Sequence, residues 1–136
     1  MAKRPRGSFR GRRPRRAAAG FEELVERALG SIPEPFARAL DEVAIVIDEE
    51  PSPTQMRESG LRPGDGLYGL YEGVPRTEWG ADWAFVPNKI TLFRRSLEED
   101  FPSAAELEHE VRVTVVHELA HHMGIDDDRL EELGLD

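Results

Sequence analysis

The sequence contains no cysteine among its 136 residues. A disulfide framework, a thiol nucleophile and a thiolate metal site are therefore excluded, and with them cysteine peptidases, thiol redox motifs and Cys-type zinc fingers. Long apolar runs are also missing, since no stretch approaches the roughly 18 consecutive apolar residues that a membrane-spanning helix needs. We expect a protein that does not enter a membrane, and the lack of cysteine fits a cytoplasmic location.

Negative charge is absent from residues 1–20, which hold 8 of the 18 Lys and Arg and none of the 27 Asp and Glu. The net charge of −9 is therefore the sum of a +8 segment and a remainder of 10 − 27 = −17. The basic segment is rich in Arg, Gly and Pro and has no hydrophobic period, so we predict a disordered N-terminal extension over 1–20. Such an arm could bind nucleic acid, but a solvated extension is the simpler interpretation. No apolar segment follows Arg16, so we expect no export signal.

The remaining residues, 21–136, have the usual length of a single domain with one core. Apolar residues recur with helical spacing from Phe21 to Leu29 and indicate a helix that Gly30 ends. A second short helix is expected through Leu40. Runs rich in β-branched and aromatic residues predict three strands: a buried strand at 43–47, a second at 67–71, and an edge strand at 89–94 with a cation at each end.

A glycine pattern of the form GxGxxG occupies 64–69. The dinucleotide-binding interpretation needs a strand before this pattern and a helix after it. Here Pro63 precedes the pattern and a strand-like run follows it. We therefore interpret Asp65-Gly66 as a turn and expect no nucleotide cofactor.

The longest predicted helix begins after Pro102, where Ser103 and Glu106 have the spacing of a helix-capping pair. Apolar residues recur from Leu107 to Met123 on most sides of this helix. A helix that is apolar around most of its circumference belongs in the core, so we expect it to be central to the fold.

The last two turns of this helix carry His117-Glu118-Leu119-Ala120-His121. Histidines at positions i and i+4 project from the same helical face, so both imidazoles can reach one Zn²⁺ ion. Glu118 lies about 100° around the helix from His117, where it can bond a water on the metal without being a ligand. The pattern predicts a zinc site with Glu118 as general base.

The residues after the helix suggest a third ligand. Gly124 can adopt the left-handed conformation that ends a helix and turns the chain back, which would bring Asp127 towards the metal. Asp126 and Asp128 compete with it for this role, and we favour Asp127. The others would supply negative charge at the start of a last helix, over 129–133.

Other polar residues of the long helix have lesser expected roles. His122 should point away from the metal face, to the surface or to a position supporting a ligand. His109 lies two turns earlier and should be solvated. Glu110 and Thr114 lie below His117 on the ligand face, so either could hydrogen-bond a ligand.

The segment His117–Leu130 resembles the signature HExxHHxGxxD of the minimal zincin-like metallopeptidases, a family of very small bacterial proteins. Residues 90–94 are also similar to the strand that precedes the active-site helix in that family. The resemblance implies an α+β fold with a small mixed sheet packed on helices. It also implies His117, His121 and Asp127 as zinc ligands and Glu118 as general base.

Together, the motif and the resemblance predict a zinc-dependent metallopeptidase that acts on a peptide or protein substrate. If 90–94 is an exposed edge strand, an extended peptide could pair with it. The alternative is a non-catalytic zinc-binding module whose basic arm binds nucleic acid or an acidic partner. The sequence leaves the substrate and the oligomeric state open.

Overall fold

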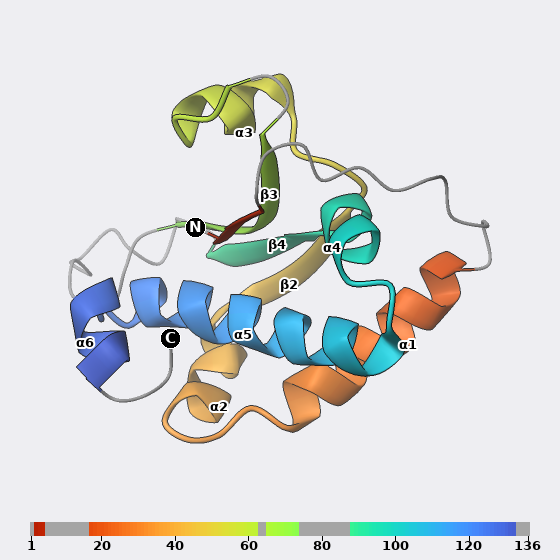
Figure 1. Ribbon diagram of the computed structural model, residues 1–136. Coiled ribbons are helices and arrows are strands. Elements are labelled where there is room, and N and C mark those ends of the chain that lie inside the picture. Colours follow the sequence, from red (N-terminus) through yellow and green to blue (C-terminus); the bar gives the residue numbers. More distant parts are fainter. Residues whose placement is uncertain (1, 5–16, 63–64, 74–87, 133–136) are drawn as a thin grey trace.

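The computed structural model describes the chain except for residues 1, 5–16, 63–64, 74–87 and 133–136, and except for the side chains of 2–4, 17–19 and 127. Its fold is of the α+β class, as the resemblance implied (Figure 1). The described strands are β1 (Ala2–Arg4), β2 (Ala44–Asp48), β3 (Gly66–Glu72) and β4 (Lys89–Phe93). The described helices are α1 (Ala17–Gly30), α2 (Phe36–Ala39), the 3₁₀ turn η1 (Leu40–Glu42), α3 (Pro53–Glu58), α4 (Arg94–Asp100), α5 (Ala104–His122) and α6 (Asp127–Glu132).

The four described strands form one mixed sheet in the order β1-β3-β4-β2. β2 and β4 are parallel, and the other two pairings are antiparallel. Two expectations about these strands are wrong. β4 is an inner strand whose residues Ile90 to Phe93 are fully buried, and β2 lies at an edge and is only half-buried. The cation that suggested an exposed end of β4, Arg94, instead begins α4 and forms ion pairs there.

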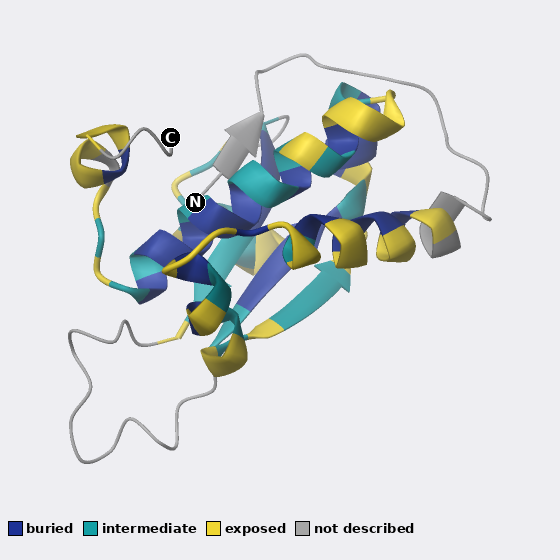
Figure 2. Cartoon of the chain, turned by 90° about the horizontal axis from the view of Figure 1, so that it is seen from below, coloured by how far each residue is buried: buried dark blue, intermediate teal, exposed yellow. Residues whose placement is uncertain are grey.

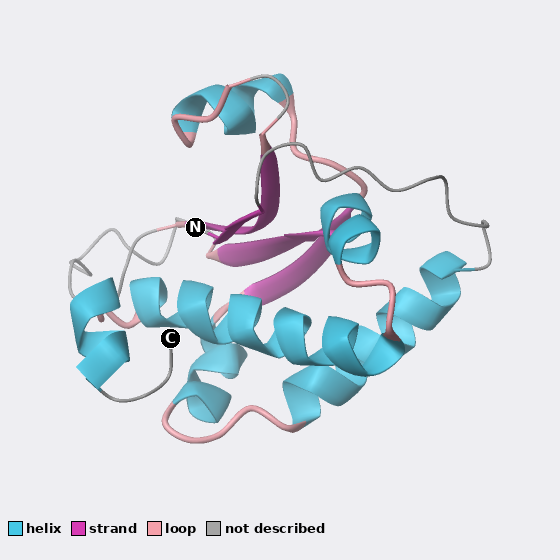
Figure 3. Cartoon of the chain, in the orientation of Figure 1, coloured by secondary structure: helices cyan, strands magenta, loops and turns pink. Residues whose placement is uncertain are grey.

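Helix α5 lies directly below the sheet (Figures 1 and 3). Helices α1 and α2 pack against α5. The approach of α5 to β3 is closest at Gly69, where an added Cβ atom would lie 2.6 Å from Cγ2 of Thr114. Any larger residue at position 69 would push the helix away from the strand. The glycine therefore fixes how close the long helix lies to the sheet.

The hydrophobic core lies between the sheet, α5 and α1, and the exposed residues gather on the outer faces of the helices (Figure 2). The helical spacing predicted for α1 is confirmed, because Phe21, Leu24, Val25 and Ala28 are all buried. Helix α5 is the longest described helix, as expected, with 19 residues. Its buried residues include Leu107, Val111, Val115, Val116, Leu119 and Ala120. No described helix is long and apolar enough to cross a membrane.

The N-terminal segment departs from the expected boundary at Gly20. β1 pairs with β3 at the edge of the sheet, and α1 begins at Ala17. The disorder expected for all of 1–20 is thus not seen at 2–4 or 17–20, and 5–16 lie outside the described residues. The division into a basic arm and a single domain, 21–136, stays a prediction.

Candidate active site

The residues of the HExxH pattern lie in the last two turns of α5, under the sheet. Ser103 caps the first turn, accepting a hydrogen bond from the Glu106 backbone N–H as the spacing predicted. The last turn ends at Gly124, which has φ +77°. Ile125 N–H then bonds the carbonyl of Ala120 at 2.7 Å, a bond that closes many helices ending in a left-handed glycine. Both ends of the helix are therefore fixed by local bonds.

His117 and His121 lie side by side on one face of α5. Their ring centroids are 5.3 Å apart and the ring planes meet at 70°. His117 is partly exposed, and the side chain of His121 is 34% exposed. The two rings therefore border solvent, through which an ion could enter, while the helix that carries them is anchored in the core.

Glu118, which directly follows His117 in the sequence, is fully buried. Its Oε1 atom accepts a hydrogen bond of 2.9 Å from the backbone N–H of Tyr71 in β3 and lies 3.5 Å from Nδ1 of His121. Burial raises the pKa of this carboxyl, but contacts that favour the carboxylate, first among them the hydrogen bond with His121, lower it by more. The net pKa lies below the ordinary 4.5, so Glu118 is ionised at neutral pH.

The turn after α5 separates the three aspartates. The Asp126 carboxylate accepts a hydrogen bond of 2.9 Å from the backbone N–H of Arg129, so it caps α6. Asp127 is the first residue of α6, but its side chain lies outside the described residues. Asp128 is exposed. Leu130, which is fully buried, anchors this helix to the core.

The two histidine rings have a spacing that two ligands of one tetrahedral zinc ion can adopt. Imidazoles bound to one zinc through Zn–N bonds of about 2.1 Å have ring centroids roughly 5 Å apart, which the spacing of 5.3 Å matches. Among the side chains that the structure describes, no three His, Asp or Glu form a complete metal site. The described part of the chain thus holds two candidate ligands, His117 and His121. Asp127, whose side chain it does not describe, is the third candidate.

Comparisons with known proteins show the family of the chain. Residues 40–135 match the model of the zincin-like metallopeptidase family. The chain belongs to this family. The zincin is also similar in structure to a conserved hypothetical protein from Thermo thermophilus, with 29% sequence identity and a TM-score of 0.52 over 88% of this chain and 99% of the other. No curated protein matches it.

A buried polar network beside the site was not expected from the sequence. His122 is fully buried, with Nδ1 2.9 Å from the Tyr71 hydroxyl and Nε2 2.8 Å from Oε1 of Glu42. The Tyr71 hydroxyl also donates to Asn88. Tyr71 therefore links this network to the site, bonding His122 through its side chain and Glu118 through its backbone. The paired histidines at 121 and 122 were the one sequence signal that could have pointed to it.

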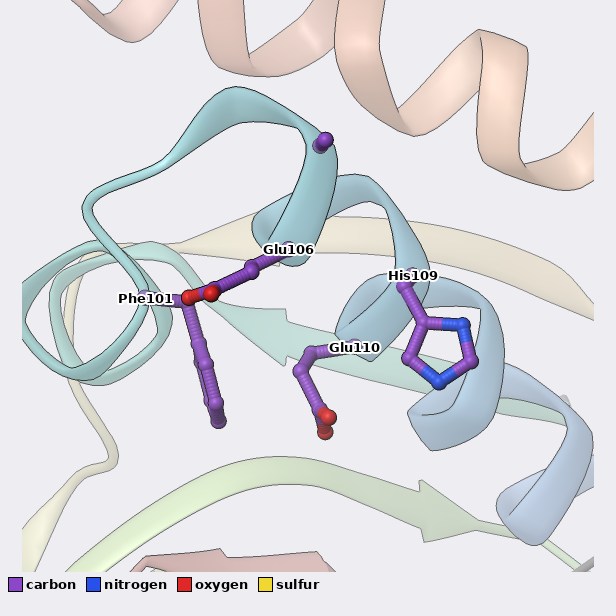
Figure 4. A pocket seen from close by; sticks show the side chains of 5 residues that line it. Phe101, Glu106, His109 and Glu110 are labelled. Carbon is purple, nitrogen blue, oxygen red and sulfur yellow. The ribbon is translucent and has the colours of Figure 1, made fainter.

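The remaining polar residues of α5 lie away from the pattern. His109 is exposed, as expected, and contacts Arg112. Glu110 borders a shallow pocket at the other end of the helix (Figure 4), whose lining residues are Phe101, Ala105, Glu106, His109 and Glu110. Thr114 is buried against Gly69. The structure thus places Thr114 in a packing contact and Glu110 about two turns from His117.

Proposed function

We propose that this zincin is a zinc-dependent peptidase, with His117, His121 and Asp127 as metal ligands and Glu118 as general base. The observation that carries the proposal is the placement of Glu118. It is an ionised, buried carboxylate that contacts one candidate ligand and is held by a backbone amide of β3. Burying a charged side chain costs free energy unless it has partners, so an acid in this position is not expected in a helix with a purely structural role.

The third ligand is favoured by what its neighbours do. Asp126 is engaged in capping α6, and Asp128 is exposed. Asp127 follows a turn that Gly124 makes possible, on a helix anchored by Leu130. Two imidazoles and a carboxylate in a chain without cysteine suit zinc better than harder cations such as magnesium.

When bound, zinc would polarise a substrate carbonyl and make a water acidic enough to lose its proton near neutral pH. Glu118 is suited to receive that proton because its carboxylate lies 3.5 Å from Nδ1 of the candidate ligand His121. The same carboxyl group can then deliver the proton to the leaving amine. Tyr71 N–H, bonded to Oε1, keeps the carboxylate turned towards the strand edge where the substrate would lie.

The substrate would lie along β3. The strand first expected to bind it, β4, is an inner strand and has no free edge. An extended peptide can add to a sheet edge through backbone hydrogen bonds. The β3 edge passes directly beside Glu118, so a peptide bonded there would have its backbone next to the general base.

The test is Glu118→Gln, which preserves size and removes the base. Cleavage of a library of fluorescence-quenched peptides by the zinc-loaded protein should fall about 10²–10⁴-fold, with zinc content unchanged. Glu110→Gln, on the same helix and about two turns away, is the matched control and should cleave as the wild type does. Wild-type protein that holds stoichiometric zinc and cleaves no peptide would favour the non-catalytic zinc-binding module instead.

A further inference from the structure

The outer edge of β3 runs past the general base. On its inner side β3 pairs with β4, where Tyr71 lies opposite Ile90. The N–H of Tyr71 bonds Glu118 and so faces away from β4. Amides of alternate residues along a strand face the same edge. The amides of Gly69 and Leu67 therefore face outwards as well.

β1 occupies this same edge. The strands are antiparallel, with Ala2 opposite Gly69 and Lys3 opposite Leu67. Two residues of β3 whose amides face outwards, Gly69 and Leu67, are thus among those that β1 pairs with. Arg4 lies opposite Gly66, and the register shifts between Ala2 and Lys3. Followed backwards from Arg4 to Ala2, β1 approaches the end of β3 that carries Tyr71. A segment of the protein's own backbone lies where the proposed substrate would lie.

Charge favours this arrangement. Residues 1–20 carry 8 Lys and Arg and no Asp or Glu, whereas the rest of the chain carries 10 positive and 27 negative side chains. A basic strand on an acidic protein gains long-range attraction in addition to its backbone hydrogen bonds. Glu118 is fully buried in the state in which β1 lies on this edge. A substrate that pairs with this edge of β3 at Leu67 and Gly69 would have to take the place of β1.

We propose that β1 is a built-in occupant of the peptide-binding edge of β3, and that the edge accepts extended basic peptides that displace β1. The proposal rests on the proposed function for what the edge is used for, but occupancy and binding can be measured without turnover. Because β1 is part of the same chain, it competes at a high effective concentration and weakens the binding of every peptide added from outside.

The test compares two variants of the full-length protein with the metal removed by chelation. Lys3→Pro removes the backbone N–H opposite Leu67, and Lys3→Ala loses the same charge but keeps that N–H. In Lys3→Pro we expect the amides of Leu67 and Gly69 to exchange hydrogen at least ~10-fold faster than in the wild type, as measured by NMR. In Lys3→Ala their exchange should stay close to the wild-type rate.

The second measurement uses a fluorescein-labelled synthetic peptide with the sequence of residues 1–16 as the probe. Its affinity, followed by fluorescence anisotropy, should be ~3–10-fold higher for Lys3→Pro than for wild type or Lys3→Ala. Equal exchange rates in all three proteins, or equal probe affinities for the two variants, would overturn the proposal. Neither readout needs zinc or cleavage. A protein that cleaves no peptide could therefore still show both effects, and a protein that shows neither effect could still be a peptidase.

Discussion

Two groups of ionisable side chains in this zincin differ in how their charges are matched. The ion-pair cluster lies where β2 and β4 end side by side. Asp48 is opposite Phe93 in these parallel strands, so the residues that follow them meet. Each guanidinium of this cluster has two carboxylate partners: Arg94 bonds Glu49 and Glu98, and Arg95 bonds Glu50 and Glu99.

The site cluster, comprising His117, Glu118, His121, His122 and Tyr71, is built differently. Its fully buried carboxylate bonds a backbone amide and lies beside an imidazole that is partly exposed. Opposite full charges satisfy each other in the ion-pair cluster, which suits a structural role. Imidazoles beside a carboxylate are instead suited to binding a cation and moving a proton.

The largest expected effect is a loss of zinc affinity on substitution of residues in or near the site cluster. His117→Ala and Asp127→Ala should each weaken zinc binding at least ~100-fold, because each removes one of the three proposed ligands. Competition with a chromophoric chelator measures the affinity. His109→Ala and Asp126→Ala are the matched controls, since His109 is exposed and Asp126 caps α6. Equal zinc affinity in Asp126→Ala and Asp127→Ala would remove Asp127 from the ligand set.

The second prediction concerns the buried end of the site cluster. His122→Ala should lower the free energy of unfolding of the metal-free protein by about 2–4 kcal/mol. The substitution leaves a cavity and deprives both Glu42 and the Tyr71 hydroxyl of a hydrogen-bond partner. Urea denaturation measures the change, and His109→Ala should stay within about 0.5 kcal/mol of wild type. A loss below that of the control would show that the network contributes no stability.

The third prediction tests the structural role of the ion-pair cluster. Arg94→Met should cost about 1–3 kcal/mol, because the side chain of its partner Glu98 is only 7% exposed and would lose its charged hydrogen bond. Arg95→Met, where the arginine side chain is 51% exposed, should cost less than about 1 kcal/mol. Zinc affinity should be unchanged in both variants. A zinc defect in either would mean that the two clusters are coupled.

Local sequence rules predicted the site cluster only in part. The spacing of His117 and His121 and the turn at Gly124 depend on residues a few positions apart, and helical geometry alone brings them together. The partners of His122 are 51 and 80 residues away in sequence, so no periodicity reveals them. The bond from Tyr71 to Glu118 uses a backbone amide, which every residue except proline has, so the sequence does not reveal it.

The sheet shows the same limit. The positions of β2, β3 and β4 followed from runs of β-branched and aromatic residues, but their order in the sheet did not. Lys89 and Arg94 suggested an edge because cations often protect edge strands. They flank β4 without interrupting its buried interior, so the pattern fits an inner strand equally well. Strand order is set by contacts with α5 and with other strands, which lie far away in the sequence.

The smallest effect is expected at the exposed side of the ion-pair cluster. Hydrogen bonding from the Arg94 guanidinium holds the pKa of the Glu49 carboxyl below 4.5. Because the pKa is lower in the folded state, the carboxylate stabilises the fold at pH values above its unfolded-state pKa. This contribution is lost as the pH falls through the folded-state pKa. Since the Glu49 side chain is 61% exposed, Glu49→Gln should cost less than about 1 kcal/mol near neutral pH.

That difference from the wild type should shrink as urea denaturation is repeated at successively lower pH, because protonation of Glu49 makes its side chain neutral like that of Gln. High salt should reduce it near neutral pH, whereas the loss in Arg94→Met should persist, since Glu98 is shielded from solvent. A Glu49→Gln effect that stays constant with pH would show that its carboxylate charge does not stabilise the fold.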